Sequence, residues 1–222
     1  MGPSGKCVSG FHRTSPSLAS SGAPVCVGGT AADPRSKGVA TMPAATRETS
    51  ERPAVGPDRF RTLMRRFATG VTVVTCPGPD GPEGITVNAF TSVSLRPPRV
   101  LVSLDRRSRT LPSILTAGRF AVNVLGWGQR ELATRLADKM RTPAQRFAGI
   151  RESILVTGSP VLPDSLAVID CLLAQVWPCD DHVLLVGDVV GGSAERVDEP
   201  LLFYEGGFCM SAMSPSGAIG SA

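Results

Sequence analysis

Apolar residues change their spacing along the chain, and these changes mark the expected secondary structure. Phe60, Leu63, Met64 and Phe67 recur at intervals of three and four. The stretch Pro57–Gly70, with Pro in its first turn and Gly at its end, therefore predicts an amphipathic helix. After it the pattern changes to short β-branched runs separated by turn residues. Strands are expected at residues 71–76, 85–95, 99–105, 120–125, 166–178, 183–197, 201–204 and 208–210.

Helical stretches are fewer and lie between these strands. They are expected at residues 108–117, 128–139 and 142–147. In the second, Leu132, Leu136 and Met140 follow one another at a spacing of four, which is typical of a surface helix that turns one face to the core. Because strands outnumber helices and follow one another through short turns, the sequence predicts a mainly β protein, an antiparallel barrel with peripheral helices. A doubly wound α/β fold would need a helix between nearly every pair of strands.

The first 56 residues differ from the rest in composition. Gly, Pro, Ser and Thr make up 27 of them, and Phe11 is their single aromatic residue. Such a stretch buries too little apolar surface to offset its ordering entropy. We therefore expect a disordered extension over residues 1–56, a folded domain over 57–212 and a flexible tail over 213–222. A secretory signal is not expected, because residues 1–27 lack the apolar stretch of about 7–15 residues that it needs.

Net charge and cysteine spacing exclude several classes of function. Three of the four net positive charges belong to residues 1–56, so the rest is nearly neutral, and we expect no nucleic-acid and no membrane partner. No stretch approaches the roughly 20 apolar residues of a membrane helix. The six Cys show no Cys-x-x-Cys spacing and the chain has two His, which argues against a metal site and favours a reducing, cytoplasmic location. The motifs of serine hydrolases, Rossmann folds and P-loop proteins are absent.

The densest run of small and hydroxyl residues is Gly-Ile-Thr-Val-Asn-Ala-Phe-Thr-Ser-Val-Ser, residues 84–94. On one strand alternate residues share a face, so Thr86 and Asn88 would point the same way. Ser92 and Ser94 would continue that side after an irregularity. Such a face could hydrogen-bond the edge of a planar heterocycle and a phosphate tail. Composition leaves a second interpretation open, because Thr is a favoured strand residue and these hydroxyls could form a solvent face.

A second polar cluster, Ser-Leu-Asp-Arg-Arg-Ser-Arg-Thr at residues 103–110, ends a strand and opens a helix. Free backbone amides and the positive end of the helix dipole suit a phosphate there, with Arg106, Arg107 and Arg109 nearby. N-capping by Ser108 and a solvated run of charges would explain the same residues equally well.

Six short motifs follow one another in the folded part. They are Phe60-Arg-x-x-Met-x-x-Phe-Ala-Thr-Gly-Val-Thr-Val-Val-Thr75, Gly84-Ile-Thr-Val-Asn-Ala-Phe-Thr-Ser-Val-Ser-Leu-x-Pro-Pro98, Leu104-x-Arg-x-Ser-x-Thr110, Phe120-Ala-Val-Asn-Val-Leu125, Asp181-His-x-x-x-x-Gly187 and Pro200-Leu-Leu-x-Tyr204. Each motif alone has modest specificity, but the six motifs in this order resemble the flavin reductase family, the short-chain NAD(P)H:flavin oxidoreductases. The resemblance covers nearly the whole folded part.

The resemblance implies a fold and an activity. The fold is an FMN-binding split β-barrel, antiparallel and Greek-key-like, in a homodimer that holds flavin near the subunit interface. The activity is transfer of hydride from NADH or NADPH to FMN or FAD, and the reduced flavin goes to a partner flavin-dependent monooxygenase. Two alternatives stay open: a split-barrel flavin oxidase of the pyridoxamine phosphate oxidase-like type, and a non-catalytic flavin-binding protein.

The resemblance also implies site residues. Residues 86–89 would meet the isoalloxazine ring, residues 92–94 would lie along the ribityl chain and phosphate, and residues 103–105 would flank the flavin. His182 would be the catalytic residue, beside the nicotinamide. The expected cofactor-binding residues are Thr86, Val87, Asn88, Ala89, Ser92, Val93, Ser94, Ser103, Leu104 and Asp105, with Arg106, Ser108 and Thr110 assisting the phosphate. The sequence departs from the family pattern at Asp180, where Gly is usual, and at Phe208, where Tyr is common.

Overall fold

The computed structural model describes residues 55–194 and 196–211. All but the last two residues of the expected N-terminal extension lie outside the described residues, and so does the expected C-terminal tail. Within the described ranges, no helix is long and apolar enough to span a bilayer.

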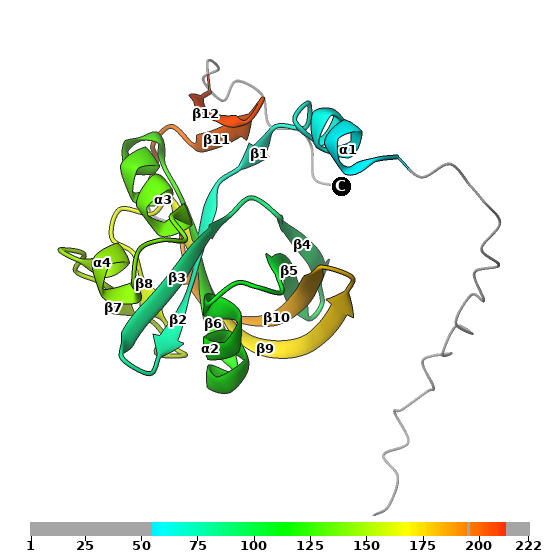
Figure 1. Cartoon of the computed structure of the whole chain (residues 1–222). Coiled ribbons are helices and arrows are strands. Elements are labelled where there is room, and N and C mark those ends of the chain that lie inside the picture. Colours follow the sequence, from blue (N-terminus) through cyan, green and yellow to red (C-terminus); the bar gives the residue numbers. More distant parts are fainter. Residues whose placement is uncertain (1–54, 195, 212–222) are drawn as a thin grey trace, which may run out of the picture. The chain divides into compact units, whose positions relative to one another are not determined.

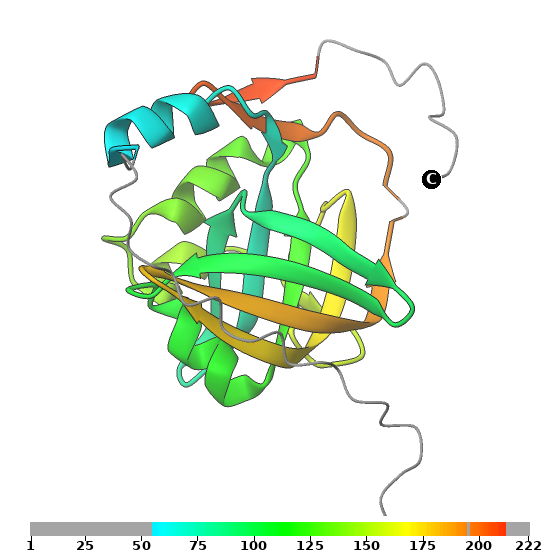
Figure 2. The same ribbon diagram turned by 90° about the vertical axis from the view of Figure 1, so that its right-hand side faces the viewer.

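A seven-stranded antiparallel sheet forms the body of the domain (Figure 1). Its strands are β2 (Thr72–Gly78), β3 (Gly81–Val87), β4 (Phe90–Leu95), β5 (Pro98–Asp105), β6 (Arg119–Val124), β9 (Ala167–Cys179) and β10 (His182–Ser193). They lie in the order β3-β2-β6-β9-β10-β5-β4, so the two edge strands, β3 and β4, are consecutive in the chain. Because only Asn88 and Ala89 join these edges, the sheet curls on itself, as Figure 2 shows for β4, β5, β10 and β9. The expected antiparallel barrel is confirmed.

In the described part of the chain, two small sheets and four helices surround the barrel. β1 (Thr69–Gly70), β11 (Leu201–Tyr204) and β12 (Gly207–Met210) form one sheet, and β7 (Ser153–Ile154) and β8 (Pro160–Val161) form the other. The helices are α1 (Pro57–Met64), α2 (Thr110–Ala117), α3 (Arg130–Ala137) and α4 (Pro143–Phe147), and a 3-10 turn over Trp127–Gln129 precedes α3.

Strand β2 is buried on both faces and divides the hydrophobic core into two parts. Because side chains alternate along a strand, neighbouring residues of β2 enter different parts. Val74 packs in the barrel interior with Phe120 and Leu185. Val73 packs on the other side with Leu136 of α3. All five side chains are fully buried, so α3 covers a face of the sheet that would otherwise meet water.

Asn123, in the fourth motif, joins three segments inside the domain. Its Nδ2 donates to the carbonyl oxygen of Val73 and to Thr75 Oγ1, both at 3.0 Å. Its Oδ1 accepts a hydrogen bond from the N–H of Leu162 at 2.9 Å. A buried amide needs such partners, and this one uses them to hold β6, β2 and the segment after β8 together. This motif residue therefore serves the fold.

Two of the expected helices end earlier in the structure than the sequence predicts. α1 ends at Met64 and not at Gly70, because Thr69 and Gly70 pair with β11 instead of continuing the helix. α3 ends at Ala137, so Met140 lies beyond it and is 89% exposed, whereas Leu136 is buried as expected.

Candidate functional site

His182 and residues 103–106 meet at one end of the barrel. In the register between β10 and β5, His182 lies opposite Asp105. The backbone N–H of Arg106 donates to the carbonyl oxygen of Asp181 at 3.0 Å, which joins the two chain segments just beyond this pair. The His182 side chain is 46% exposed, so its imidazole is open to a ligand. Two motifs that are distant in the sequence thus come together.

The expected single strand over residues 85–95 is wrong. β3 ends at Val87 and pairs with β2, whereas β4 begins at Phe90 on the opposite edge of the sheet and pairs with β5. The chain passes from one edge of the barrel to the other at this point. Residues 86–94 therefore do not form one continuous face, and their side chains belong to two different parts of the barrel wall.

The β3–β4 connection reaches the same barrel end as His182. The N–H of Ser103 donates to the carbonyl oxygen of Ala89 at 3.0 Å and holds the connection against β5. Asn88 and Ala89 are exposed there. The hydroxyl of Thr86 donates to the carbonyl oxygen of Ala133 at 2.7 Å, so its proton is used to anchor α3. We call the connection Asn88–Ala89, residues 103–106 and His182 together the barrel-end site.

A pocket of about 200 Å³ opens beside the barrel-end site. It is lined by Val71, Thr86, Val87, Asn88, Ala137, Phe203 and Phe208. The rings of Phe203 and Phe208 meet edge to face, with centroids 6.0 Å apart. Val71 lies in the first motif but was not expected to bind a cofactor, Ala137 and Phe203 were not singled out by any motif, and Phe208 carried only its difference from the common Tyr. Mostly apolar walls with one exposed amide suit part of a planar heterocycle.

Asp105 is a carboxylate held by positive groups. Its Oδ1 accepts the backbone N–H of Arg107 at 2.8 Å, and its Oδ2 lies 3.6 Å from Lys139 Nζ. The Arg107 N–H is the main cause that lowers the pKa of Asp105, and the Lys139 charge lowers it further. Asp105 is therefore ionised at neutral pH. Lys139 follows α3 and reaches the barrel-end site only through the tertiary fold.

Of the three residues expected to assist a phosphate, only Arg106 lies at the surface. Ser108 is 8% exposed and Thr110 2%. The Ser108 hydroxyl is sealed from solvent and has no hydrogen-bond partner among the described residues. The N-cap of α2 is Arg109, and no side chain caps the helix, so the alternative that Ser108 is the cap is wrong. The exposed positive charge beside this uncapped helix end comes from Arg106, Arg107 and Arg109.

Residues 92–94 lie toward the other end of the β4–β5 pair. Ser94 is opposite Arg99, near the start of β5, whereas Asp105 ends that strand. At about 3.3 Å per residue, Arg99 and Asp105 are about 20 Å apart. The register shifts between Ser92 and Ser94, whereas the sequence indicated an irregularity before Ser92. Within one chain, residues 92–94 therefore lie away from Arg106 and the rest of the barrel-end site.

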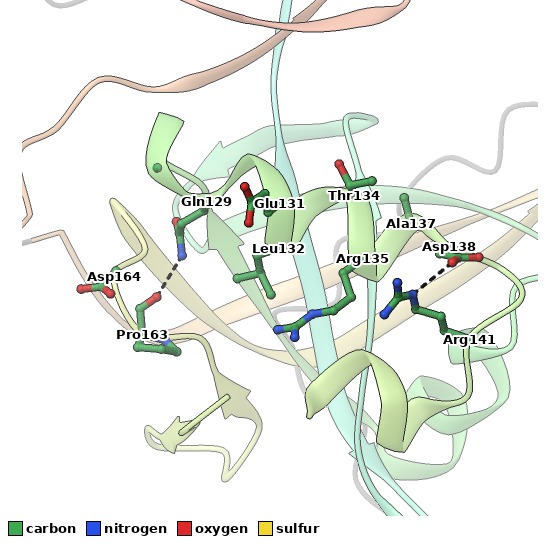
Figure 3. A pocket seen from close by; sticks show the side chains of 11 residues that line it. Gln129, Glu131, Leu132, Thr134, Arg135, Ala137, Asp138, Arg141, Pro163 and Asp164 are labelled. Atoms are coloured by element: carbon green, nitrogen blue, oxygen red, sulfur yellow. Dashed lines mark hydrogen bonds and ion pairs between the residues drawn. The ribbon is translucent and has the colours of Figure 1, made fainter. Parts of the chain in front are cut away.

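A separate pocket of about 820 Å³ lies along α3 (Figure 3). Gln129 Nε2 donates to the carbonyl oxygen of Pro163 at 2.9 Å on one side of it, and Arg141 pairs with Asp138 at 3.1 Å on the other. Its lining carries charges of both signs and none of the expected cofactor-binding residues. We therefore place the candidate site at the barrel end.

Comparison with known proteins identifies the family. The model of the flavin reductase like domain matches residues 64–212. A flavin reductase from Pseudomonas putida is 40% identical over 158 residues, which cover 71% of this chain and 91% of that protein. HsaB, the reductase subunit of a flavin-dependent monooxygenase from Rhodococcus jostii, is 40% identical over 69% of this chain and 77% of its own length. The chain belongs to the flavin reductase family.

Solved structures give the same result for the fold. The NADH:FAD oxidoreductase SgcE6 of Streptomyces globisporus, in complex with NAD and FAD fragments, is 30% identical with a TM-score of 0.66, covering 75% of this chain and 100% of SgcE6. The styrene monooxygenase flavin reductase of Pseudomonas putida S12 is 29% identical with a TM-score of 0.64, covering 70% and 99%. The expected family, the split-barrel fold and the class of NAD(P)H:flavin oxidoreductase are confirmed.

Proposed function

We propose that the protein transfers hydride from NADH to FMN or FAD and supplies the reduced flavin to a partner flavin-dependent monooxygenase. The observation that carries the proposal is the meeting of three motifs in the barrel-end site. The names of relatives support it: HsaB is a reductase subunit, and SmoA of Agrobacterium fabrum, 40% identical, is an FMN reductase (NADH). Because SgcE6 is an NADH:FAD oxidoreductase, the proposal keeps both flavins and takes NADH as the donor.

The residues of the barrel-end site and its neighbouring pocket fit a flavin. The aromatic walls Phe203 and Phe208 suit the apolar part of the isoalloxazine. The exposed backbone at Asn88–Ala89 offers hydrogen-bonding groups to its polar edge. Arg106 and Arg109, both exposed, would supply positive charge to a phosphate.

The chain's own part in the reaction is to bind, align and exclude water. A flavin, when bound, supplies a ring that accepts hydride directly from the nicotinamide. Alignment of two rings then accounts for most of the rate, and a strong general base is not required. We assign His182 to contact with the nicotinamide, and the backbone of residues 87–89 and 103–105 to orientation of the flavin.

One assay tests the reductase activity. Purified full-length protein is mixed with NADH and an excess of FMN or FAD under anaerobic conditions, and loss of the reduced nicotinamide absorbance is followed. We expect a loss that depends on both protein and flavin. Reactions without flavin are the control. If no flavin-dependent oxidation of NADH occurs, the proposed activity is wrong.

We further propose that the protein is a homodimer, because α1 presents an apolar face that its own chain leaves open. Phe60, Leu63 and Met64 are 57%, 54% and 48% exposed, and Phe67, just after the helix, is 65% exposed. No residue of α1 is buried. An eight-residue helix has little stability of its own, and in proteins helices are stabilised by packing of their apolar face. A second copy of the chain that covers this face would supply that packing.

Charge on the α1 face is expected to separate the dimer. A Phe60→Glu/Leu63→Glu double variant would place two carboxylates in the proposed contact, where burying unpaired charge is costly. Light scattering after size exclusion should give twice the 23.2 kDa chain mass for the wild type and close to one chain for the variant. Val197→Glu, at a residue 96% exposed elsewhere, is the control and should stay dimeric. A dimer that persists in the double variant would exclude this face as the interface.

A cytoplasmic location stays a prediction from cysteine usage. Cys76 and Cys171 are fully buried, and burial raises the pKa of each thiol to about 12, so neither is a reactive thiolate near neutral pH.

A further inference from the structure

The Asp180–Asp181 turn carries His182 into the barrel-end site. The turn joins β9 to β10, and His182 is paired with β9 on one side and with Asp105 of β5 on the other. The carbonyl oxygen of Asp181 accepts a hydrogen bond from the Arg106 N–H at 3.0 Å. The backbone of Asp181 and His182 is therefore fixed by the strands on both sides, and only the side chains have freedom.

The contact between the two side chains defines the tautomer of His182. Nδ1 of His182 lies 2.8 Å from Oδ1 of Asp181. This hydrogen bond is the main cause that lowers the pKa of Asp181, so its carboxyl group is ionised at neutral pH. An ionised carboxylate only accepts hydrogen bonds, so the proton between the two atoms belongs to Nδ1. In the neutral imidazole Nε2 then carries the free lone pair.

We propose that Asp181 is a positioning residue that holds His182 in this tautomer, so that Nε2 accepts a hydrogen bond from the carboxamide NH2 of the nicotinamide. The proposal rests on the proposed function, because it takes NADH as the substrate beside His182. Asp181, which precedes the expected catalytic residue His182, acts through that residue. His182 then recognises the carboxamide through its donor NH2 and not through its acceptor oxygen.

Other charged groups around His182 do not replace this contact. Asp105 faces it from β5, but that carboxylate is engaged by the Arg107 N–H and Lys139. Asp180 precedes it in the turn, and the hydrogen bond and ion pair of the imidazole are with Asp181. Cys179 of β9 lies opposite. Asp180 therefore offers a matched control, a carboxylate in the same turn without the hydrogen bond.

Substitutions in this turn should leave the fold intact. The side chains of His182 and Asp181 are 46% and 81% exposed, and exposed pairs contribute little to stability. Asp180 has a left-handed backbone with φ of 48°, a conformation that Asn tolerates well. Asp181→Asn and Asp180→Asn therefore remove the same charge from the same turn with little change in shape. Circular dichroism and the melting temperature check that both variants fold.

The tautomer can be measured without any activity. The chain contains two histidines, His12 and His182, and His12 lies outside the described residues. In protein labelled with ¹⁵N-histidine, two imidazoles are observed, and the His182→Gln variant assigns them. We expect the neutral form of wild-type His182 to carry its proton on Nδ1. An Asn side chain can donate as well as accept, so Asp181→Asn should give a mixture of tautomers, and Asp180→Asn should not.

Kinetics test whether the tautomer serves the nicotinamide. We expect His182→Ala to raise the KM for NADH about tenfold, the loss of roughly one good hydrogen bond. Asp181→Asn should raise it less, in proportion to the fraction of His182 that loses the Nδ1 proton, while the KM for flavin stays within a factor of two of wild type. The reduced 3-acetylpyridine analogue of NADH has a methyl group where the carboxamide has NH2. Its KM should hardly respond to Asp181→Asn. The preference for NADH over the analogue should therefore shrink in Asp181→Asn and in His182→Ala, and be retained in Asp180→Asn.

The outcomes separate this proposal from the proposed function. A wild type that oxidises no NADH with flavin overturns the proposed function and the nicotinamide contact with it. With an active wild type, an unchanged NADH preference in Asp181→Asn overturns the positioning role alone. A wild-type His182 that carries its proton on Nε2 also overturns the positioning role. An equal loss of NADH preference in Asp180→Asn overturns it too, because the loss would then come from the negative charge of the turn. A mixed tautomer together with the selective loss of NADH preference supports the proposal.

Discussion

Gly187→Ala is expected to lower the free energy of unfolding by about 2 kcal/mol, because the added methyl group has no room in the core. A Cβ at this position would lie 2.6 Å from Cζ of Phe120 and 2.9 Å from Cβ of Cys171. Both neighbours are fully buried, and Cys171 Cβ is attached directly to the backbone of β9. The ring or the strand must shift, and a close-packed core resists both.

Urea denaturation measures this effect, and three further variants make the result specific. Gly70→Ala adds a methyl group where nothing lies within 4 Å, so it should change stability by less than about 1 kcal/mol. Phe120→Leu removes the ring that the new methyl group would meet. In the double variant Gly187→Ala/Phe120→Leu, the loss should be smaller than the sum of the single losses. Strict additivity would mean that Phe120 is not the obstacle.

Arg146→Met is expected to destabilise the domain by about 3 kcal/mol, because it leaves one buried and one half-buried carbonyl group without their partner. Arg146 is 7% exposed, and its Nε and Nη2 donate to the carbonyl oxygen of Asp138 at 3.1 and 2.7 Å. Its Nη1 donates to the carbonyl oxygen of Gly84 at 3.2 Å. Burial, followed by the nearby charge of Arg109, lowers the pKa of this guanidinium, yet Arg stays protonated in proteins. One side chain thus ties the end of α3 to β3.

Thermal and urea unfolding of three variants test this role of Arg146. Arg61→Met removes a guanidinium that is 69% exposed and paired only at the surface, so its effect should be within about 0.5 kcal/mol. Arg146→Lys keeps the charge but lacks the planar fork that reaches two carbonyl groups, so we expect a loss between those of the other two. If Arg146→Met is as stable as Arg61→Met, water satisfies these carbonyl groups and Arg146 does not hold the elements together.

The barrel strands were predictable where the strand pattern of the sequence coincides with the strand pairing in the barrel. Residues 99–105 alternate in burial along β5, and the expected strand matches the observed Pro98–Asp105 closely. The break at Asn88–Ala89 was not predictable, because residues 85–95 contain no Gly or Pro and keep a strand pattern throughout. Strand pairing alone decides where this run divides, since closure of the barrel requires its two halves to pair with different neighbours.

The candidate site was predictable only in part. Residues 103–106 and His182 carried motifs, and the structure brings them together. Lys139 and Phe203 reach the site from distant segments, and no local pattern distinguishes them from ordinary surface and core residues. The family resemblance implied that Ser108 and Thr110 assist a phosphate, but the turn before α2 buries Ser108 and the start of α2 buries Thr110. A hydroxyl side chain is common to caps, cores and ligand sites, so its type alone does not decide its role.

The sequence by itself determined the mainly β architecture and the order of the family motifs. Periodicity and motif spacing are local properties, so they can be read directly from the order of residues along the chain. Only the tertiary structure decided which motifs share a site. It places Asp105, Ala89 and His182 at one barrel end through strand register and moves residues 92–94 toward the other. Register depends on which edges pair, and pairing is settled by contacts between residues far apart in the chain.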